Sequence, residues 1–507
     1  MKALLSVYDK AGVVDLAKGL VDLGWELISS GGTATAIADA GLPVTEVAAV
    51  TEAPEMLGGR VKTLHPKIHG GILADRSNPQ HVKDLEERGI TPIDLVVANL
   101  YPFTSDPGIE LIDIGGPTMV RAAAKNHAHV GIVVDPARYP EILAELHRHG
   151  SLTEETRRRL ARAAFAHTAA YDAAIVAWLD EDPVVAASVE AEESTLPEQL
   201  HLAADRVQEL RYGENPHQVG ARYRLAGERS WWDDATQHGG KALSYLNLYD
   251  AEAAWRLVHE LGDGPAAVVI KHANPCGAAV DEDLTTAYTR AHECDPVSAF
   301  GGIVAVNQPL PVALAEALAP VFTEVVIAPA YEDGALDVLT AKKNLRVLEA
   351  RPPGPLGLQL RTIDGGLLVQ TPDRVGVDRS TWTVVTDRQP SDDEWRDLEL
   401  AWRLVARVGS NAIVLVKDGQ AVGIGAGQQN RRDAGRIAAE KADGRAKGGA
   451  YASDAFFPFP DGLDGAVDAG ASLVIQPGGS IRDDEVIAAA DEQGLAMVFT
   501  GERHFKH

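Results

Sequence analysis

Short apolar runs alternate with an amphipathic segment at the start of the chain, and this alternation limits the folds open to it. Residues 3–7 and 25–29 are apolar runs of strand length. Between them, residues 13–23 place apolar side chains at positions 13, 16, 17, 20 and 23, the spacing of one helix face. Strands that alternate with helices at this spacing predict a parallel sheet, and we expect an α/β fold.

The length of 507 residues predicts two or more domains, each with its own core. Residues 180–197 are acidic and irregular, which is typical of a linker. We therefore expect a first domain over residues 1–185, a linker over 186–200 and a second domain over 201–507.

Charge and cysteine content narrow the classes of function. The net charge of −26 is spread along the chain, which disfavours nucleic-acid binding because phosphates need a basic surface. Two cysteines exclude a disulfide framework and fit a reducing cytoplasm. The N-terminus reaches Asp9 and Lys10 too early for a signal-peptide core, and no apolar run approaches a membrane span. We expect a soluble, cytoplasmic protein with no membrane partner.

Glycines, hydroxyls and cations gather in the predicted turns of the first domain. The Ser-Ser-Gly-Gly-Thr-Ala turn at residues 29–34 follows a strand and precedes a helix, where amides and hydroxyls can hold an anion. Taken alone, each such turn is better explained as an ordinary turn with solvated lysines. Together the strand ends and helix starts predict a nucleotide-phosphate pocket, with candidates Lys10, Ser30, Thr33, Arg60, Lys62, Asn99, Tyr101, Asp113 and Lys125.

A second polar site is predicted at Lys271 and His272. They follow residues 266–270, an apolar run typical of a buried strand, and precede a Pro-Gly turn. Open α/β sheets place chemistry at the carboxyl ends of strands. Because neighbouring cations disfavour each other, a buried pair would suit a neutral imidazole base beside an ammonium that polarises an oxygen. The alternative is a surface lysine and a hydrogen-bonded histidine at a turn.

The same stretch raises the question of zinc. Pro275-Cys276 is similar to the start of the Pro-Cys-x-x-Cys motif of zinc deaminases. The position of the second cysteine is occupied by Ala279, and the other cysteine of the chain is Cys294. We therefore expect no catalytic metal.

A tight hairpin is predicted further along. Asp418-Gly419 separates apolar residues 412–417 from residues 420–425, a strong signal for a type I′ turn. Gly423 and Gly425 fail the dinucleotide fingerprint, and we expect them to let the backbone approach a flat ligand. The glycine-containing hairpins hint at a duplicated α/β unit, although the sequence shows no clean repeat.

Eight motifs, in one order along nearly the whole chain, resemble a known family. They are SGGTA, GGRVKTLHP, NLYPF, IDIGG with RAAAKNH, RYGENPHQ, KHANPCG, GIGAGQQNR and SDAFFPFPD. The chain is similar to the bifunctional phosphoribosylaminoimidazolecarboxamide formyltransferase / IMP cyclohydrolase family. The resemblance implies a methylglyoxal-synthase-like parallel-sheet domain, followed by a transformylase domain of two cytidine-deaminase-like α/β subdomains without zinc.

The resemblance also implies the ligands. The carboxamide nucleotide (AICAR) would take the formyl group of 10-formyltetrahydrofolate, and the product (FAICAR) would close to IMP with loss of water. The reduced folate would be a cosubstrate, and a homodimer would be the working form.

The resemblance implies roles for individual residues. His272 would remove the amine proton while Lys271 and Asn411 stabilise the oxyanion, and Lys125 would be the acid/base of ring closure with Lys62, Tyr101 and Asp113. The cyclohydrolase would bind nucleotide through Lys10, Ser30, Gly31, Gly32, Thr33, Arg60, Thr63, Asn99 and Ile114. AICAR would bind Arg211, Tyr212, Gly301, Glu324, Phe456 and Arg503, and folate would bind Arg431, Asp461, Ser480 and Ile481. Two positions depart from the family pattern: Tyr8 stands where some members have serine, and Asn430 replaces a common serine.

Two other functions fit parts of the sequence. A zinc nucleoside deaminase would contain bound zinc, which the missing ligand opposes. A non-catalytic purine-nucleotide sensor would bind the same ligands without turnover, and Lys125, Lys271 and His272 would then have no purpose.

Overall fold

The computed structural model describes residues 1–54, 56–57, 61–180 and 196–507. The chain separates into two compact units. The N-terminal unit comprises Met1–Asp205 with Arg224–Glu228, and the C-terminal unit comprises Arg206–Tyr223 with Arg229–His507. Most of the expected linker lies outside the described residues.

The N-terminal unit is built on a five-stranded, fully parallel sheet, which confirms the expected parallel sheet. The strands, in spatial order, are β3 (Thr45–Glu46), β2 (Glu26–Ser29), β1 (Lys2–Leu5), β4 (Leu95–Val97) and β5 (Gly131–Val133). The helices are α1 (Val13–Asp22), α2 (Gly31–Asp39), α3 (Val47–Thr51), α4 (Pro66–Leu73), α5 (Pro79–Glu87), α6 (Gly115–Lys125), α7 (Tyr139–His149) and α8 (Glu154–Asp180). The strand order reverses between β1 and β4, and the crevice at such a switch point is where open α/β sheets bind ligands.

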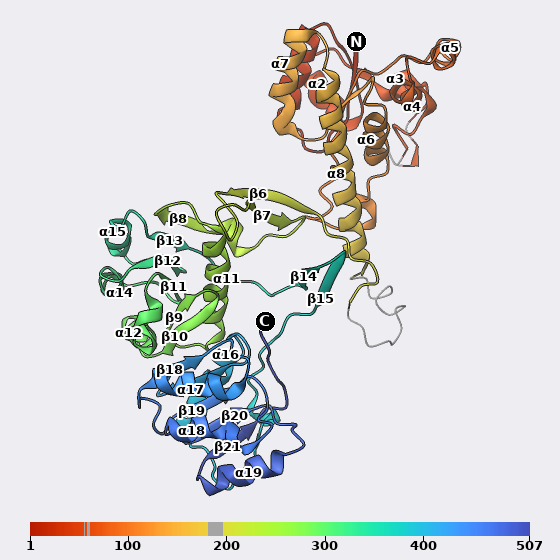
Figure 1. Ribbon diagram of the computed structural model, residues 1–507. Coiled ribbons are helices and arrows are strands. Elements are labelled where there is room, and N and C mark those ends of the chain that lie inside the picture. The colour runs from red at the N-terminus through yellow and green to blue at the C-terminus, as the bar shows by residue number, and fades with distance from the viewer. Residues whose placement is uncertain (55, 58–60, 181–195) are drawn as a thin grey trace. The chain divides into compact units, whose positions relative to one another are not determined.

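The C-terminal unit contains a twelve-stranded mixed sheet (Figure 1). Its first half, residues 236–349, has the strands β10 (Asn274–Val280), β9 (Ala266–Lys271), β11 (Gly302–Val306), β12 (Thr323–Ala328), β13 (Arg346–Glu349) and β8 (Thr236–Gly239). Its second half, residues 383–499, has β18 (Gln420–Gly425), β17 (Ile413–Lys417), β19 (Ala450–Ser453), β20 (Leu473–Gln476), β21 (Ala496–Phe499) and β16 (Thr383–Val384). The halves meet where Ala279 of β10 pairs with Gln420 of β18.

The two halves repeat one plan. In each half an antiparallel hairpin (β9–β10 or β17–β18) is followed by an antiparallel neighbour and two parallel strands, and an antiparallel edge strand closes the order. The duplication that the sequence only hints at is therefore a property of the backbone.

Helices cover both faces of this sheet. One face of both halves packs in a single core against α11 (Tyr245–Glu260) and α16 (Asp392–Val405). The other face has a separate core in each half. The helices there are α12 (Leu284–Cys294), α14 (Val312–Leu318) and α15 (Ala335–Thr340) in the first half, and α17 (Arg431–Ala442), α18 (Asp464–Asp468) and α19 (Asp483–Glu492) in the second.

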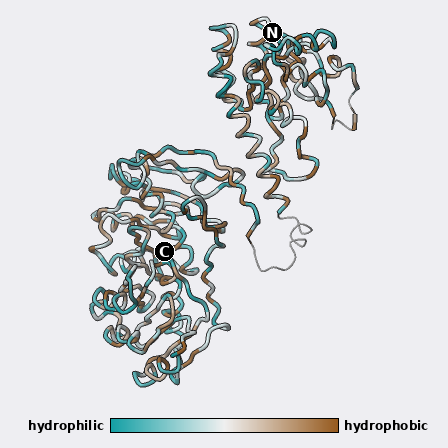
Figure 2. The backbone as a smooth tube through the Cα atoms, turned by 45° about the vertical axis from the view of Figure 1, so that its right-hand side comes forward, coloured by the Kyte–Doolittle hydropathy of each residue, from teal (hydrophilic) through white to brown (hydrophobic). Residues whose placement is uncertain are grey.

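The remaining elements are short. They include α10 (Trp231–Asp234), α13 (Pro296–Ala299) and the two-stranded sheets of β6 (Ala204–Leu210) with β7 (Gly220–Leu225) and β14 (Gln359–Ile363) with β15 (Gly366–Gln370). Hydrophobic and hydrophilic stretches alternate along the backbone of each unit (Figure 2), as expected for layers with one buried side. Among the described residues, no helix is both long and apolar enough to cross a membrane.

The close approach of strand and helix explains the glycines of β18. A Cβ on Gly423 would overlap the carbonyl oxygen of Ala438, and one on Gly425 would overlap that of Ala434. Both carbonyls belong to α17, so the expectation of a flat ligand at these glycines is wrong. In the same way, a Cβ on Gly277 of β10 would overlap the carbonyl oxygen of Ala291 on α12.

Candidate active sites

A cavity of about 610 Å³ opens at the carboxyl ends of β1, β2 and β4 in the N-terminal unit. Its lining contains nearly all the residues expected at the nucleotide site: Lys10, Ser30, Gly31, Gly32, Thr33, Lys62, Thr63, Asn99, Tyr101, Asp113 and Ile114. The structure brings them together because the strand order places these three strand ends side by side, at the switch point. Arg60 lies outside the described residues.

Two ammonium groups flank the glycine turn that begins α2. A Cβ on Gly31 would lie 3.5 Å from Lys62 Nζ, and one on Gly32 would lie 3.6 Å from Lys10 Nζ. The first amides of α2 have no partner within the helix and carry its positive end. Amides and ammonium groups at one turn form a site that suits a phosphate.

A carboxyl and a phenol lie on the other side of this cavity. Gly116 N donates to Asp113 Oδ1 over 2.9 Å, and burial raises the pKa of Asp113. Burial, together with the Asp113 and Tyr8 charges, also raises the pKa of Tyr101. The rings of Tyr8 and Tyr101 meet edge to face at 5.3 Å, and Tyr8 lines the cavity. Burial therefore disfavours the charged form of both acidic groups.

Other expected residues hold the cavity's loops. Asn99 Oδ1 accepts from the backbone amides of Tyr8 (2.7 Å) and Asp9 (2.9 Å). Thr33 exchanges hydrogen bonds with both the amide and the carbonyl of Val7. These side chains fix the β1–α1 loop beside the cavity.

Lys125 is not among the residues that line this cavity. It is exposed at the last position of α6, whereas the cavity touches the first turns of that helix. Nine residues at a rise of 1.5 Å separate it from Gly116, about 14 Å along the helix axis.

In the C-terminal unit, Lys271 ends β9 and His272 forms a tight turn with Ala273. Both turn residues have positive φ, 55° and 53°. The expected Pro-Gly turn is wrong, since Pro275 and Gly277 lie within the returning strand β10. Of the two alternatives for this pair, the structure favours the turn: His272 is exposed and Lys271 is half-buried.

Three first-half candidates lie at this edge of the sheet. Lys271 Nζ donates to the carbonyl of Phe300 over 2.8 Å, next to Gly301. Gly301 has φ 73° and precedes β11, while Glu324 is near the start of β12 and accepts from Asn247 Nδ2 over 2.8 Å. The antiparallel pairing of β9 and β11 places the end of one beside the start of the other.

The second half contributes Asn411 and Arg431. Asn411 precedes β17, and its Nδ2 donates to the carbonyl of Gln428 over 2.9 Å. Arg431 Nη2 pairs with the fully buried Asp454 at 2.8 Å, and Phe456 follows two residues later. The neighbouring Asn430 caps α17 by accepting from Asp433 N.

Asn274 joins the two groups of candidates. Its Nδ2 donates to the carbonyl of His272 over 3.1 Å, and its Oδ1 accepts from Gly409 N over 2.8 Å. Gly409 is two residues before Asn411. The expected base and the expected oxyanion-stabilising amide therefore lie on connected loops.

The remaining candidates lie elsewhere in this unit. The Arg211 guanidinium lies over the ring of Tyr212 at 4.7 Å, and the Arg503 guanidinium lies over Phe505 at 4.6 Å. Asp461 and Ile481 are exposed, and Ser480 Oγ accepts from Arg482 N. No hydrogen bond or ion pair among the described residues joins these side chains to His272.

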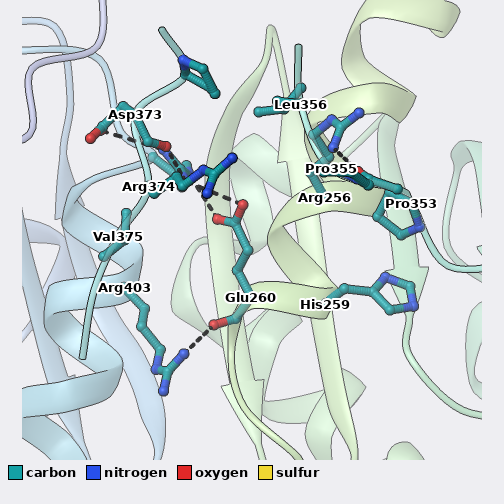
Figure 3. Close-up of a pocket in the computed structure, with 13 residues that line it drawn as sticks. Arg256, His259, Glu260, Pro353, Pro355, Leu356, Asp373, Arg374, Val375 and Arg403 are labelled. Atoms are coloured by element: carbon teal, nitrogen blue, oxygen red, sulfur yellow. Dashed lines mark hydrogen bonds and ion pairs between the residues drawn. The ribbon is translucent and has the colours of Figure 1, made fainter. Parts of the chain in front are cut away.

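An ion-paired cavity of about 330 Å³ is lined by α11, residues 353–356, residues 372–375, Arg403 and Arg407 (Figure 3). Arg407 donates to both carboxylate oxygens of Glu260 (2.6 and 3.2 Å) and to the carbonyl of Asp373 (3.1 Å). Asp373 Oδ1 lies 2.8 Å from His504 Nδ1. These contacts tie α11, the stretch after β15 and the C-terminal segment to one another.

Sequence reasoning missed Asp250 and Lys506, which contact the backbone of the His272 turn. No local pattern marks either residue, because their partners are 22 to 233 positions away. Among the described residues, no group of three or more His, Cys, Asp or Glu side chains is placed to hold a metal.

Comparisons with known proteins match the whole chain. The AICARFT/IMPCHase bienzyme family matches residues 123–441, and the MGS-like domain family matches residues 12–124. Two proteins named "Bifunctional purine biosynthesis protein PurH", from two strains of Bacillus cereus, are each 50% identical over 100% of this chain and 99% of the relative.

One solved structure, titled "Crystal structure of ForH", is 40% identical over 35% of this chain and 97% of that chain, with a TM-score of 0.33. The family matches confirm the methylglyoxal-synthase-like first domain, while the cytidine-deaminase-like character of the two halves stays a prediction. On the full-length relatives and the two matching families, the chain belongs to the AICARFT/IMPCHase bienzyme family.

Proposed function

We propose that the C-terminal unit formylates AICAR and that the N-terminal unit closes the product to IMP. The chain is a bifunctional enzyme of purine biosynthesis, an AICAR formyltransferase and IMP cyclohydrolase. The observation that supports the division of labour is the cavity at β1 and β4, where Lys10, Lys62, Tyr101 and Asp113 converge.

The proposed formyl donor is 10-formyltetrahydrofolate. The 5-amine of AICAR attacks the formyl carbon, His272 takes the proton that the amine loses, and the bond to N10 of the folate breaks as N10 gains a proton. Lys271 and Asn411 stabilise the oxyanion of the intermediate. AICAR contacts are proposed for Arg211, Tyr212, Gly301, Glu324, Phe456 and Arg503, and folate contacts for Arg431, Asp461, Ser480 and Ile481.

Ring closure is proposed for the cavity of the N-terminal unit. The phosphate of FAICAR binds the amides of α2 with Lys10 and Lys62. The carboxamide nitrogen attacks the formamide carbon, and the formyl oxygen leaves as water with one proton from the carboxamide nitrogen and one from the formamide nitrogen. Tyr101 donates a hydrogen bond to that oxygen, and Asp113, with Lys62, helps to bind and polarise the formamide.

A single assay tests the pair of reactions. Purified protein is mixed with AICAR and 10-formyltetrahydrofolate, and formation of tetrahydrofolate and IMP is followed. We expect both products. Binding of the nucleotide without turnover would identify a sensor and not an enzyme.

Lys125 requires a test of its own, because it lies outside the cavity. Ring closure of ready-made FAICAR is measured for Lys125→Ala and Lys62→Ala. A loss of about 10²-fold or more in Lys125→Ala would support the acid/base role. An unchanged rate in Lys125→Ala, with a loss in Lys62→Ala, would assign proton transfer to the groups that line the cavity.

The proposed domains are residues 1–185 and 201–507, and the proposed working form is a cytoplasmic homodimer. A fragment of residues 1–199 should be soluble and should close FAICAR. Light scattering on the full chain tests the dimer. An insoluble fragment, or a monomer that is fully active, would contradict these assignments.

A further inference from the structure

The turn that carries His272 is held at every backbone polar group. Asp250 accepts from both turn amides, with Oδ2 at 3.2 Å from His272 N and Oδ1 at 2.8 Å from Ala273 N. The His272 carbonyl accepts from Asn274 Nδ2, and the Ala273 carbonyl accepts from Lys506 Nζ over 2.6 Å. A non-glycine pair at positive φ persists only where its surroundings fix it.

Asp250 reaches the turn from α11. Its carboxylate is only partly exposed, and burial raises its pKa, while the two amides oppose that rise. A carboxylate that accepts from two successive amides fixes the orientation of both peptide planes. Because the His272 side chain leaves the backbone between these amides, its direction depends on the Asp250 carboxylate.

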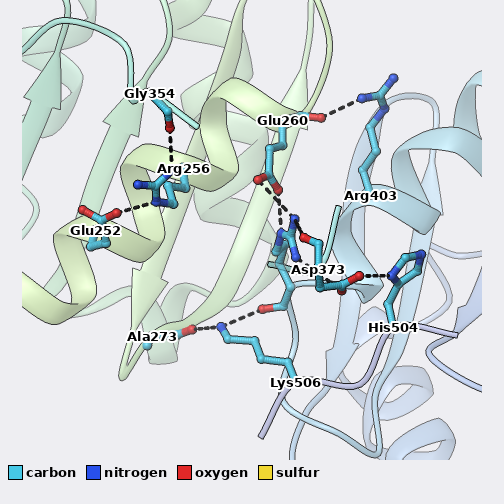
Figure 4. Close-up of polar contacts among 10 residues, drawn as sticks. Glu252, Arg256, Glu260, Ala273, Gly354, Asp373, Arg403, His504 and Lys506 are labelled. Atoms are coloured by element: carbon cyan, nitrogen blue, oxygen red, sulfur yellow. Dashed lines mark hydrogen bonds and ion pairs between the residues drawn. The ribbon is translucent and has the colours of Figure 1, made fainter. Parts of the chain in front are cut away.

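Lys506 reaches the turn from the C-terminal segment (Figure 4). Its ammonium also donates to the carbonyl of Arg407 over 2.9 Å, and its own carbonyl accepts from Ser410 N over 2.9 Å. Ser410 precedes Asn411, so Lys506 contacts both the turn of His272 and the loop of Asn411. Burial lowers the pKa of Lys506 to about 8, so the ammonium is held there at a cost in solvation.

We infer that Asp250 and Lys506 are positioning residues for formyl transfer. Asp250 sets the direction of the His272 side chain, and Lys506 fixes the position of the His272 turn relative to the loop of Asn411. This inference rests on the proposed role of His272 as the base. Neither residue touches the reacting atoms in this scheme, so both act through His272 and Asn411.

The second half of the sheet supplies a matched control. Asp397 on α16 accepts from the amides of Asp418 (2.9 Å) and Gly419 (2.8 Å), the turn of the equivalent hairpin. That turn carries none of the proposed catalytic residues. Loss of Asp397 therefore measures what such a carboxylate contributes to folding alone.

The first experiment compares Asp250→Asn with Asp397→Asn. We expect Asp250→Asn to lower kcat for formyl transfer by about 10–100-fold, since misplacement of a catalytic group by about 1 Å has effects of that size. The KM for AICAR should change less than about threefold, and closure of FAICAR should not change. Asp397→Asn should lower the melting temperature comparably and leave formyl transfer within about twofold. Equal activity losses in the two variants would overturn the inference for Asp250.

The second experiment replaces the ammonium. Lys342 is the control, because its Nζ also donates to two backbone carbonyls, those of Leu318 and Val321. We expect Lys506→Met to lower kcat by about 10-fold or more, Lys506→Arg to restore most of it, and Lys342→Met to leave it unchanged. The comparison of Lys506→Met with Lys342→Met remains a test even if the Asp250 variant does not fold. Equal rates for Lys506→Met and Lys342→Met would overturn the inference for Lys506.

A double-mutant cycle separates the inference from the proposed function. If His272→Ala retains formyl transfer, the assignment of the base is wrong. If His272→Ala loses formyl transfer while Asp250→Asn and Lys506→Met keep it, the positioning role of Asp250 and Lys506 is wrong. If His272 is the base and Asp250 positions it, adding Asp250→Asn to His272→Ala should cause no further loss of formyl transfer, because the group that Asp250 positions is gone. A further loss of the same size in that background would show that Asp250 acts independently of His272 and would overturn the inference.

Discussion

The two halves of the twelve-stranded sheet have the same backbone and different turns. In the first half the hairpin turn is His272-Ala273, and in the second half it is Asp418-Gly419. Both turns have positive φ at both positions, and both are held by an aspartate from the covering helix. The two turns differ in their own residues and in the cation that contacts each of them, Lys506 in the first half and Arg290 in the second.

Aspartate and glycine adopt the left-handed conformation at little cost. Histidine and alanine do so at about 1–2 kcal/mol per residue. The first half thus accepts strain at the residue proposed to be the base, and the second half keeps the sequence that suits the turn. The comparison teaches that the hairpin belongs to the fold of both halves, and that one copy of it carries the side chain proposed to be the base.

The largest difference between the turns should be chemical. His272→Ala should slow formyl transfer by about 10²–10⁴-fold, the usual contribution of a general base. Asp418→Ala should leave that rate within about twofold. Each variant is assayed separately with AICAR and 10-formyltetrahydrofolate and with ready-made FAICAR, whose closure should not change. A folded His272→Ala that lost both reactions would show that the two sites are not separate.

The buried strand–helix contacts should respond alike in the two halves. A Cβ on Gly277 or Gly423 would overlap a helix carbonyl, that of Ala291 or Ala438. We expect Gly277→Ala and Gly423→Ala each to lower the free energy of unfolding by about 2–4 kcal/mol, since backbone cannot move aside cheaply. Urea denaturation of both variants provides the measurement. A much smaller loss in one half would break the structural equivalence.

The cations that hold the two turns should differ in pH dependence. Burial, with the charge of Arg407, lowers the pKa of Lys506 from 10.5 to about 8. Between these values the unfolded chain binds more protons at this site than the folded chain, so stability rises with pH across the window and is lost as pH falls through 8. The stability difference between wild type and Lys506→Met should therefore grow by about 1–3 kcal/mol from pH 8 to pH 10.5.

Arg290, whose guanidinium donates to the carbonyl of Asp418, is the matched cation of the second half. Arginine stays charged across this range. The stability difference for Arg290→Met should therefore be flat between pH 8 and pH 10.5, as measured by urea denaturation at several pH values. A flat difference for Lys506→Met as well would contradict the burial of its ammonium.

The smallest effects concern strain in the turns themselves. Ala273→Gly should raise the free energy of unfolding by about 0.5–1 kcal/mol, because glycine removes the left-handed penalty. Gly419→Ala should lower it by about 1–2 kcal/mol, since its Cβ would lie only 2.8 Å from the carbonyl oxygen of Val280. Thermal unfolding monitored by circular dichroism tests both. Equal signs for the two substitutions would contradict the strain assigned to the first half.

Local sequence determined the elements that form from short-range pattern. The first two strands and the helix between them, the strand before His272 and the Asp418-Gly419 turn are predicted by periodicity and turn chemistry alone. The cavity of the N-terminal unit was also predictable, because parallel strands with known directions bring their carboxyl ends to one edge.

Tertiary structure decided what depends on distant partners. Sequence pattern predicts a Pro-Gly turn after Lys271, but the turn lies at His272-Ala273 because Asp250 and Lys506, from a helix and from the C-terminus, satisfy its backbone. The placement of Lys125 away from the cavity follows from the length of α6. The duplication of the halves is visible in the strand order and not in the amino-acid sequence, because many different apolar sequences can pack the same layers of sheet and helix. Local pattern encodes what neighbours in the chain can enforce, and only the folded packing brings together groups that are more than 200 residues apart.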